Sequence, residues 1–291
     1  HFLIPGTRFY RAYGTFEQPN PYAGYLGMTL ALGVGILGAC GLRWMSERRW
    51  GGLLGMGAAI GPMAAALGAS WSRGGWIGFA AALGAITLAL PRRSRWGILL
   101  VAGLVALFLA LWSAGIVPSR IAARLTDFIA DLRFQDVRGV NINSANYAVI
   151  ERLAHWQSAL EMWRFRFWTG IGFGGYEPAY PAFALVNWPI ALGHAHNFYL
   201  NLLAETGVIG LVAYLALWGA VFWRTWKATR SGAGLERGIA VGLLGAWTHL
   251  SVHHLVDNLY VNNVHLFIGL SLGMLAALRL SRIGPTERGR A

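Results

Sequence analysis

The chain has 291 residues, of which 56% are hydrophobic and only 12% are charged. An ordinary soluble domain carries about 25% charged residues, so this composition excludes a surface fully exposed to water. The formal net charge is +12, but the cations lie between apolar runs rather than on one soluble face. That distribution argues against a nucleic-acid-binding domain and favours contact with anionic lipid or a phosphate-bearing substrate. The single cysteine, Cys40, lies in an apolar run, so no disulfide framework is expected.

The first residue is His1, and no positively charged segment with a cleavage site follows it. We therefore expect no secretory signal. We interpret the chain as the C-terminal part of a longer protein.

Apolar segments long enough to cross a bilayer, which takes about 20 residues, recur along the chain. They lie at 21–42, 52–70, 74–90, 96–117, 197–223, 238–256 and 262–280. The expected fold is therefore all-α, a polytopic transmembrane bundle of about seven spans with a long outer segment. Small residues at four-residue spacing are typical of close helix packing in lipid, and here they are Gly51 with Gly55, Gly57 with Gly61, and Gly74 with Gly78.

The short connections alternate in basic content, which predicts the orientation of the chain in the membrane. The basic connections, expected in the cytoplasm, carry Arg43, Arg48 and Arg49, then Arg92, Arg93 and Arg95, then Arg224, Lys227, Arg230 and Arg237, and finally Arg279, Arg282, Arg288 and Arg290. The N-terminus would then lie outside and the C-terminus inside. We divide the chain into 1–117 with the first four spans, an outer catalytic segment 118–196, and 197–291 with the last three spans.

The outer segment contains two predicted amphipathic helices, at 121–134 and 146–167. A loop rich in glycine and proline follows at 170–189 and leads to His194. Such a loop over a membrane surface is a place where a site can be built.

Four polar clusters are expected on the outer side. They are residues 14–20 with Asn20; Ser72-Arg73-Gly74; Arg152, Trp156, Ala159 and Trp163 on one helix face; and His194, His196 and Asn197, followed at helical spacing by Asn201 and Glu205. The first three clusters have structural alternatives. The first can be a helix-entry turn, the second an arginine reaching lipid phosphates, and the third an arginine stacked on tryptophan. Glu205 either orients His196 or pairs with an arginine.

Taken together and in this order, the clusters resemble the O-antigen ligase family over residues 14–216. The resemblance includes Gly170-x-Gly172-x-Gly174 and the run from His196-Asn197 through Glu205 and Gly207 to Gly210. It implies a membrane glycosyltransferase that moves a glycan from an undecaprenyl diphosphate carrier to an acceptor hydroxyl, outside the bacterial cytoplasmic membrane. The implied partners are that donor, a lipid or glycan acceptor, and membrane lipids, with no nucleic acid.

By the same resemblance, Arg73 and Arg152 would hold the diphosphate and His196 would act on the acceptor hydroxyl. The predicted substrate-binding residues are Arg73, Arg152, His194, Asn197, Glu205, Asn20, Gly172 and Gly174. Guanidinium groups stabilise charge that grows on the leaving oxygens, and an imidazole accepts a proton near neutral pH. We therefore expect neither a cofactor nor a metal.

Other interpretations stay open. The acceptor is another carrier-linked glycan if the protein is a polymerase, and a transporter or a scaffold would have no catalysis. Transporters tend to place ionisable groups near the bilayer midplane, which disfavours transport here. A second polar stripe, His249, His253 and Asp257, is expected on the sixth span, either as a hydrogen-bonded cluster or as a zinc site.

Overall fold

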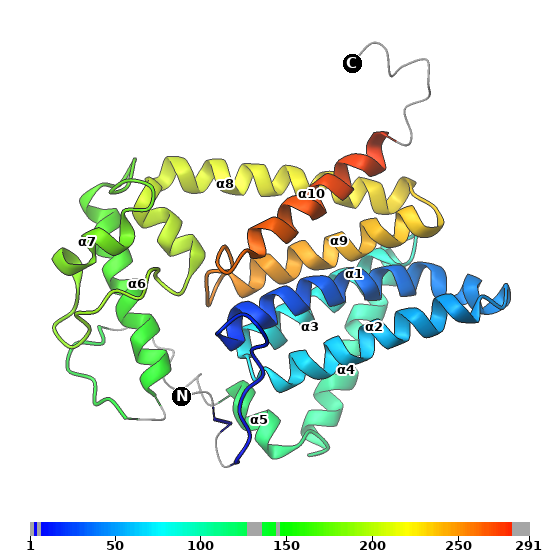
Figure 1. The fold of residues 1–291 in the computed structure, drawn as a ribbon, viewed down its shortest axis with the longest axis horizontal. Helices are drawn as coiled ribbons and strands as arrows, with labels where there is room; N and C mark the ends of the chain where they lie inside the picture. Colours follow the sequence, from blue (N-terminus) through cyan, green and yellow to red (C-terminus); the bar gives the residue numbers. More distant parts are fainter. Residues whose placement is uncertain (1–2, 5–6, 127–135, 144–145, 281–291) are drawn as a thin grey trace, which may run out of the picture. The chain divides into compact units, whose positions relative to one another are not determined.

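A computed structural model describes residues 3–4, 7–126, 136–143 and 146–280. Within them the secondary structure is helical, apart from an isolated bridge between Leu3 and Tyr10. The helices are α1 (Pro19–Ser46), α2 (Trp50–Ala69), α3 (Arg73–Ala89), α4 (Ser94–Ser113), α5 (Ser119–Thr126), α6 (Tyr147–Phe165), α7 (Tyr176–Phe183), α8 (Phe198–Ser231), α9 (Gly234–His253) and α10 (Val264–Leu280) (Figure 1). The expected all-helical fold is confirmed.

The chain forms two compact units. Unit 1 comprises His1–Ala106, Ala220–His253 and Leu259–Ala291, and unit 2 comprises Leu107–Gly219 and His254–Asn258. The boundaries fall within α4 and α8. The functional division into 1–117, 118–196 and 197–291 is a separate prediction, and it stays one.

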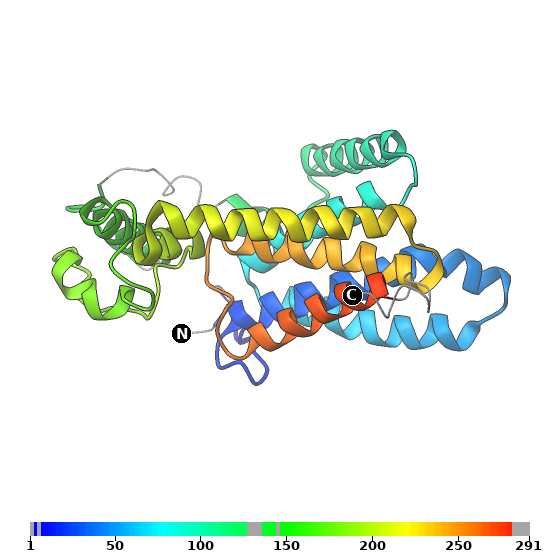
Figure 2. The same ribbon diagram turned by 90° about the horizontal axis from the view of Figure 1, so that it is seen from above.

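The core of unit 1 is a close packing of α9 along α1 and α3 (Figures 1 and 2). Glycines make the approach of α1 and α9 close. A Cβ atom built on Gly35 would lie 2.2 Å from the backbone nitrogen of Gly242, and one on Gly242 would lie 2.6 Å from the carbonyl oxygen of Leu32. Backbone atoms cannot move aside as a flexible side chain can, so these two positions admit no side chain without separating the helices.

His249 of α9 is buried in this core, and two glycines make room for its ring. A Cβ on Gly27 of α1 would lie 2.0 Å from Cε1 of His249, and one on Gly78 of α3 would lie 3.1 Å from Nδ1. The packing expected of Gly78 is therefore confirmed. The packing expected at four glycines of α2 is not seen within the described residues, none of which lies within 4 Å of a Cβ built on Gly51, Gly55, Gly57 or Gly61.

Each predicted apolar segment contains a helix. By length and composition, α1, α2, α4 and α8 can cross a membrane, whereas α3 and α10 are shorter apolar helices. The span count of seven therefore stays a prediction. In α2 the buried set is Leu67 and in α4 it is Gly97, so their apolar side chains are left exposed, as lipid contact requires.

Two helix boundaries differ from the sequence prediction in ways that matter for function. The segment predicted at 197–223 is α8, which extends to Ser231 and is broken at Gly207 (φ 63°, ψ −166°). The segment predicted at 238–256 is α9, which ends at His253. Asp257 therefore does not continue the helical stripe of His249 and His253, and that part of the prediction is wrong.

The structure describes one of the two amphipathic helices predicted in the outer segment in full and the other in part. The prediction at 146–167 is confirmed by α6. The one at 121–134 corresponds to α5, and its last part lies outside the described residues, as do the basic residues Arg282, Arg288 and Arg290.

Contacts within unit 1 join connections that were predicted to lie on the same side of the membrane. The α3–α4 and α8–α9 connections, both predicted to be cytoplasmic, contact each other: Nη1 of Arg92 donates to the carbonyl of Arg230 at 2.9 Å, and Nη1 of Arg230 donates to the carbonyl of Pro91 at 2.6 Å. At the opposite, predicted outer end, Asn262, the first residue of the last predicted span, donates to the carbonyl of Phe16 in the N-terminal segment at 3.1 Å. These contacts support the predicted grouping of the loops, while the assignment of each group to a side of the membrane stays a prediction.

Replacing Gly35 by alanine should destabilise the protein. The new Cβ would overlap the Gly242 backbone, and overpacking of this kind costs about 1–3 kcal/mol. Thermal unfolding in detergent should show a lowered midpoint for Gly35→Ala. Gly61→Ala is the matched control, since it makes the same change in a helix where the Cβ meets open space. Equal midpoints for the two variants would contradict the close approach of α1 and α9.

Candidate active site

The loop that precedes α8 in unit 2 is held by side-chain caps. Oδ1 of Asn197 accepts from the backbone N–H of Leu200 at 3.1 Å, which is a helix N-cap interaction. Oδ1 of Asn201, one turn further on, accepts from the backbone N–H of Ala195 at 3.0 Å. His196 lies between Ala195 and Asn197 with a φ of +52°, a left-handed conformation rare for a residue with a side chain. The two asparagines thus hold the backbone that presents His196.

Helix α6 supports this loop from the other side. Nε1 of Trp156 donates to the carbonyl oxygen of His196 at 3.3 Å. Ala159, one turn along the same helix, packs with Ala195 in a buried cluster, and both are almost fully inaccessible. The spacing Arg152-x3-Trp156-x2-Ala159 is therefore explained, because the last two residues bind the histidine loop.

A backbone crossing fixes the glycine-rich loop against α8. A Cβ on Gly170 would lie 2.3 Å from the carbonyl carbon of Glu205, and one on Gly207 would lie 2.3 Å from that of Trp168. Both glycines have positive φ angles, 64° and 63°. The loop then hydrogen-bonds to the helix where it breaks, since Gly172 N–H donates to the Glu205 carbonyl at 2.9 Å.

Glu205 serves this crossing as well. Its Oε1 accepts from the backbone N–H of Tyr176 at the start of α7, at 3.2 Å, and the residue is 8% exposed. We expected the carboxylate either to orient His196 or to pair with an arginine, and the contact seen is with a backbone amide instead. The backbone N–H of Gly172 is likewise engaged. The role of Gly172 and Gly174 in binding substrate stays a prediction.

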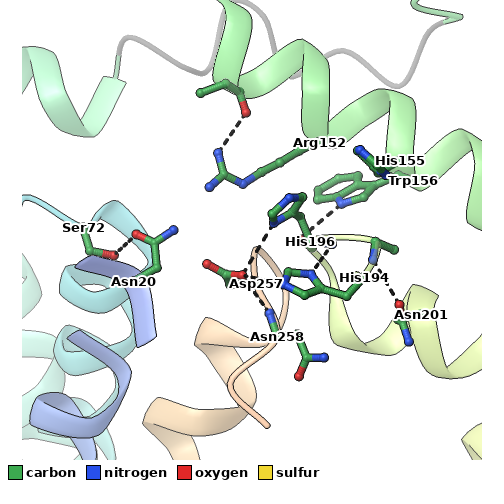
Figure 3. A network of polar contacts seen from close by, with 12 residues as sticks. Asn20, Ser72, Arg152, His155, Trp156, His194, His196, Asn201, Asp257 and Asn258 are labelled. Atoms are coloured by element: carbon green, nitrogen blue, oxygen red, sulfur yellow. Dashed lines mark hydrogen bonds and ion pairs between the residues drawn. The ribbon is translucent and has the colours of Figure 1, made fainter. Parts of the chain in front are cut away.

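Two imidazoles converge on one carboxylate in unit 2 (Figure 3). Nδ1 of His196 lies 3.6 Å from Oδ1 of Asp257, and Nε2 of His194 lies 4.0 Å from the same oxygen. Asp257 is also fixed by the N–H of Asn258, which donates to Oδ1 at 2.9 Å. The segment of Asp257 is tied to α8 because Phe198 N–H donates to the carbonyl of His254 at 2.9 Å.

A hydrogen bond defines the tautomer of His194, and the position of the Asp257 carboxylate indicates that of His196. Nδ1 of His194 accepts from the backbone N–H of His196 at 3.1 Å, so its proton is carried on Nε2, which faces Asp257. A carboxylate favours a proton on the facing Nδ1 of His196. The lone pair of His196 is then on Nε2, the nitrogen that a base uses. Such contacts are often long before substrate binds.

The electrostatics keep Asp257 ionised. Burial raises the pKa of the carboxyl, but the facing imidazole of His196, with smaller contributions from Arg152 and His194, outweighs burial and holds this pKa well below its usual range. Arg152 is therefore close enough to act on Asp257, as Figure 3 illustrates. For His194, burial lowers the pKa to about 4, with His196 and Arg152 adding to the shift and Asp257 opposing it. His194 is thus neutral at pH 7.

A third histidine, His155 of α6, packs behind His196. Its ring stacks on Tyr180 at 4.7 Å, meets the ring of His196 edge-on at 5.7 Å, and Nδ1 lies 2.9 Å from the hydroxyl of Tyr176. Burial lowers the pKa of His155 to about 4, with the charges of His196 and His194 adding to the shift. A neutral, fully packed ring therefore limits how far His196 can turn.

Of the residues predicted from the sequence, the structure brings Arg152, His194, His196, Asn197 and Glu205 into one unit, together with Gly172 and Gly174. Asn20 and Arg73 belong to unit 1. There, Oγ of Ser72 donates to Oδ1 of Asn20 at 2.9 Å and caps α3 by accepting from Gly75 N–H at 3.3 Å. Arg73 is the first residue of α3, so its position depends on this cap.

His194, His196 and Asp257 also offer two nitrogens and one oxygen within 4.8 Å of one another, a donor set that zinc accepts. The tautomer of His194 argues against a metal. Its Nε2 must lose the proton to bind a metal, which requires Nδ1 to give up the backbone hydrogen bond of His196. The contacts of His194 therefore fit a neutral imidazole facing the carboxylate better than a metal ligand.

Sequence reasoning missed two residues of the site. Asp257 was placed on the stripe with His249, because nothing in the pattern marked the end of α9 at His253. His155 was passed over although it directly precedes Trp156, and the signal was available: it is a titratable residue on the face of α6 opposite the solvent.

The fold defines a helical membrane protein. Its polar site is formed by loop and helix residues of unit 2. A family model described as O-antigen ligase matches residues 58–215, more than half of the chain. The chain therefore belongs to the O-antigen ligase family, which confirms the resemblance seen in the motifs. Membership implies enzyme activity of the ligase or polymerase type on lipid-linked glycans. A search of curated proteins found no match.

The matched region covers Arg73, Arg152, the glycine loop, the histidines and Glu205. Asn20 and Asp257 lie outside it. Asp257 is thus joined to the family's motif region by the fold of this chain and not by its sequence.

Acid should destabilise the protein through His155 and His194. Their folded pKa values of about 4 lie below the ordinary 6.5, so the stability that depends on their neutral forms is complete above pH 6.5 and is lost as the pH falls toward 4. For fully buried His155 the loss is about 3 kcal/mol. Unfolding midpoints measured from pH 7.5 to 4 should fall less steeply for His155→Gln than for the wild type, and identical slopes would contradict the buried neutral state.

Proposed function

We propose that this protein is a glycosyltransferase that moves a glycan from an undecaprenyl diphosphate carrier to an acceptor hydroxyl, without a metal. The supporting observation is the triad in unit 2, in which Asp257 faces Nδ1 of His196 and leaves Nε2 to act as the base. Family membership supplies the substrate class.

The reaction follows from the roles of these groups. Nε2 of His196 takes the proton of the acceptor hydroxyl while the hydroxyl oxygen attacks the anomeric carbon of the donor sugar. The bond between that carbon and the diphosphate oxygen breaks, and its electron pair stays on the diphosphate. The imidazolium is stabilised by Asp257 and later releases its proton to water. In-line attack inverts the anomeric centre.

Arg152 is proposed to bind the diphosphate. Its Nη1 donates to the carbonyl of Ala148 at 2.8 Å, which orients the guanidinium, and the residue is partly exposed. A guanidinium presents a planar set of donors that matches phosphate oxygens and stays charged. The negative charge that develops on the leaving diphosphate is thereby stabilised in the transition state. Arg73 is assigned the same role on the resemblance to the family alone.

The proposed setting is a bacterial cytoplasmic membrane crossed about seven times, with the site on the outer face. The contacts among the loops of unit 1 support the grouping of the connections, and the positive charge of one group supports its cytoplasmic side. The acceptor decides between a ligase and a polymerase, and the same triad serves both reactions.

Removing the base should abolish most of the transfer. With purified carrier-linked glycan, His196→Ala should lower turnover by about 10²- to 10⁴-fold, measured with a chelator present. Asp257→Asn should also lower turnover strongly, since an amide N–H facing Nδ1 moves the proton to Nε2. His265→Ala, an exposed histidine of α10, is the control. Wild-type turnover in His196→Ala would refute the mechanism, and loss of wild-type activity on chelation would favour a metal.

Arg152→Ala should lower turnover by about 10²- to 10³-fold because a charge-stabilising donor is lost. Arg152→Lys should fall between that variant and the wild type, since a lysine keeps the charge but not the fork of donors. Arg164→Ala is the control on the same helix, an exposed arginine paired with Glu161. Arg73→Ala tests the other proposed arginine in the same assay. Equal activity of the Arg152→Ala and Arg164→Ala variants would remove Arg152 from the site.

A further inference from the structure

A cavity of about 730 Å³ opens between the C-terminal parts of α8 and α10. All the residues that line it belong to unit 1. The ones that matter here are four apolar side chains and two cations, Val221, Leu272, Leu275, Leu278, Arg224 and Lys227. None of the described residues lining the cavity is acidic.

The apolar part of the cavity has a floor on α9. Ala228 and Leu278 are buried together with Ala240, and Leu275 packs against them. This buried cluster brings residues of α8, α9 and α10 together beside the cavity. The apolar side chains that line the cavity form a continuous apolar wall, called the channel below.

The two cations that line the cavity differ from the arginines that stabilise the fold. Arg230 and Arg237 donate to backbone carbonyls of the α3–α4 connection and of the last turns of α8, those of Pro91 and Thr229 among them. Arg224 and Lys227 instead lie three residues apart on one exposed face of α8, where side chains at this spacing are neighbours. Nζ of Lys227 lies 4.7 Å from the ring centre of Trp223. Tryptophan and cations at a helix end mark the level of lipid headgroups.

We propose that this cavity binds an anionic phospholipid, with the phosphate at Arg224 and Lys227 and an acyl chain along the apolar wall. Charge complementarity and the joined apolar channel support this occupant over a free anion, which would leave the channel without a partner. Two cations near a membrane surface each attract anionic lipid by about 1 kcal/mol, which converts to about a tenfold to thirtyfold preference for both. The proposal does not depend on glycan transfer, since His196 belongs to unit 2.

The test is native mass spectrometry of the full chain, purified in detergent and titrated with phosphatidylglycerol or phosphatidylcholine. Phosphatidylglycerol should bind the wild type about tenfold more tightly than phosphatidylcholine does. Arg224→Gln combined with Lys227→Gln should remove this preference. Arg93→Gln combined with Arg95→Gln, which removes the same charge from exposed positions outside the lining, should keep it.

A second arm separates the lipid from its headgroup. Leu272→Trp fills the channel without changing charge and should weaken binding of phosphatidylglycerol. Glycerol phosphate, which carries the anion alone, should bind at least tenfold more weakly than the lipid. Equal binding of both phospholipids to the wild type, retention of the preference in the double glutamine variant, or glycerol phosphate binding as tightly as the lipid would each overturn the proposal.

Discussion

The carboxylate of Asp257 imposes the strongest physical constraint on unit 2. A buried carboxylate is costly unless it is paired and hydrogen-bonded, and here two imidazoles and a backbone N–H surround it. The contact is formed by chain segments about 60 residues apart, and the hydrogen bond from Phe198 to His254 keeps them together. The same charge that needs these partners also selects the tautomer of His196. The packing of this loop and the role that we propose for His196 therefore both depend on a single ionised group.

The glycines of the family motif have a structural role in this chain. Gly170 and Gly207 stand where two backbones cross, and any side chain there would overlap main-chain atoms. The crossing breaks α8, so that its first turns belong with the histidine loop and its remainder is free to be a membrane helix. Glu205 completes the joint by binding the start of α7. A motif that suggests phosphate contact is thus explained first by how closely the chain must approach itself.

Much of the architecture was accessible from the sequence, because apolar length and helical spacing are strong local signals. The helix at 146–167 and the loop that leads to His194 were both predicted. Asp257 was not, because its role depends on where α9 ends, and the run from His249 continues at helical spacing past the true end. The close packing of α1 against α9 at Gly35 and Gly242 could not be predicted from the sequence either. Glycines in α2 show the same regular spacing, but a Cβ built on them would contact none of the described residues.

The net charge of +12 does not by itself identify a function, because the contacts of the individual arginines differ. Arg92, Arg230 and Arg237 satisfy carbonyls at helix ends, where partial negative charge accumulates, and so join two connections on one end of unit 1. Arg152 is held by a carbonyl of its own helix but keeps part of its surface exposed, which suits a transient anionic partner. The structural arginines and Arg152 thus differ in how many main-chain carbonyls their guanidinium groups bind. We propose that the partly exposed guanidinium of Arg152, close to the ionised Asp257, stabilises the departing diphosphate.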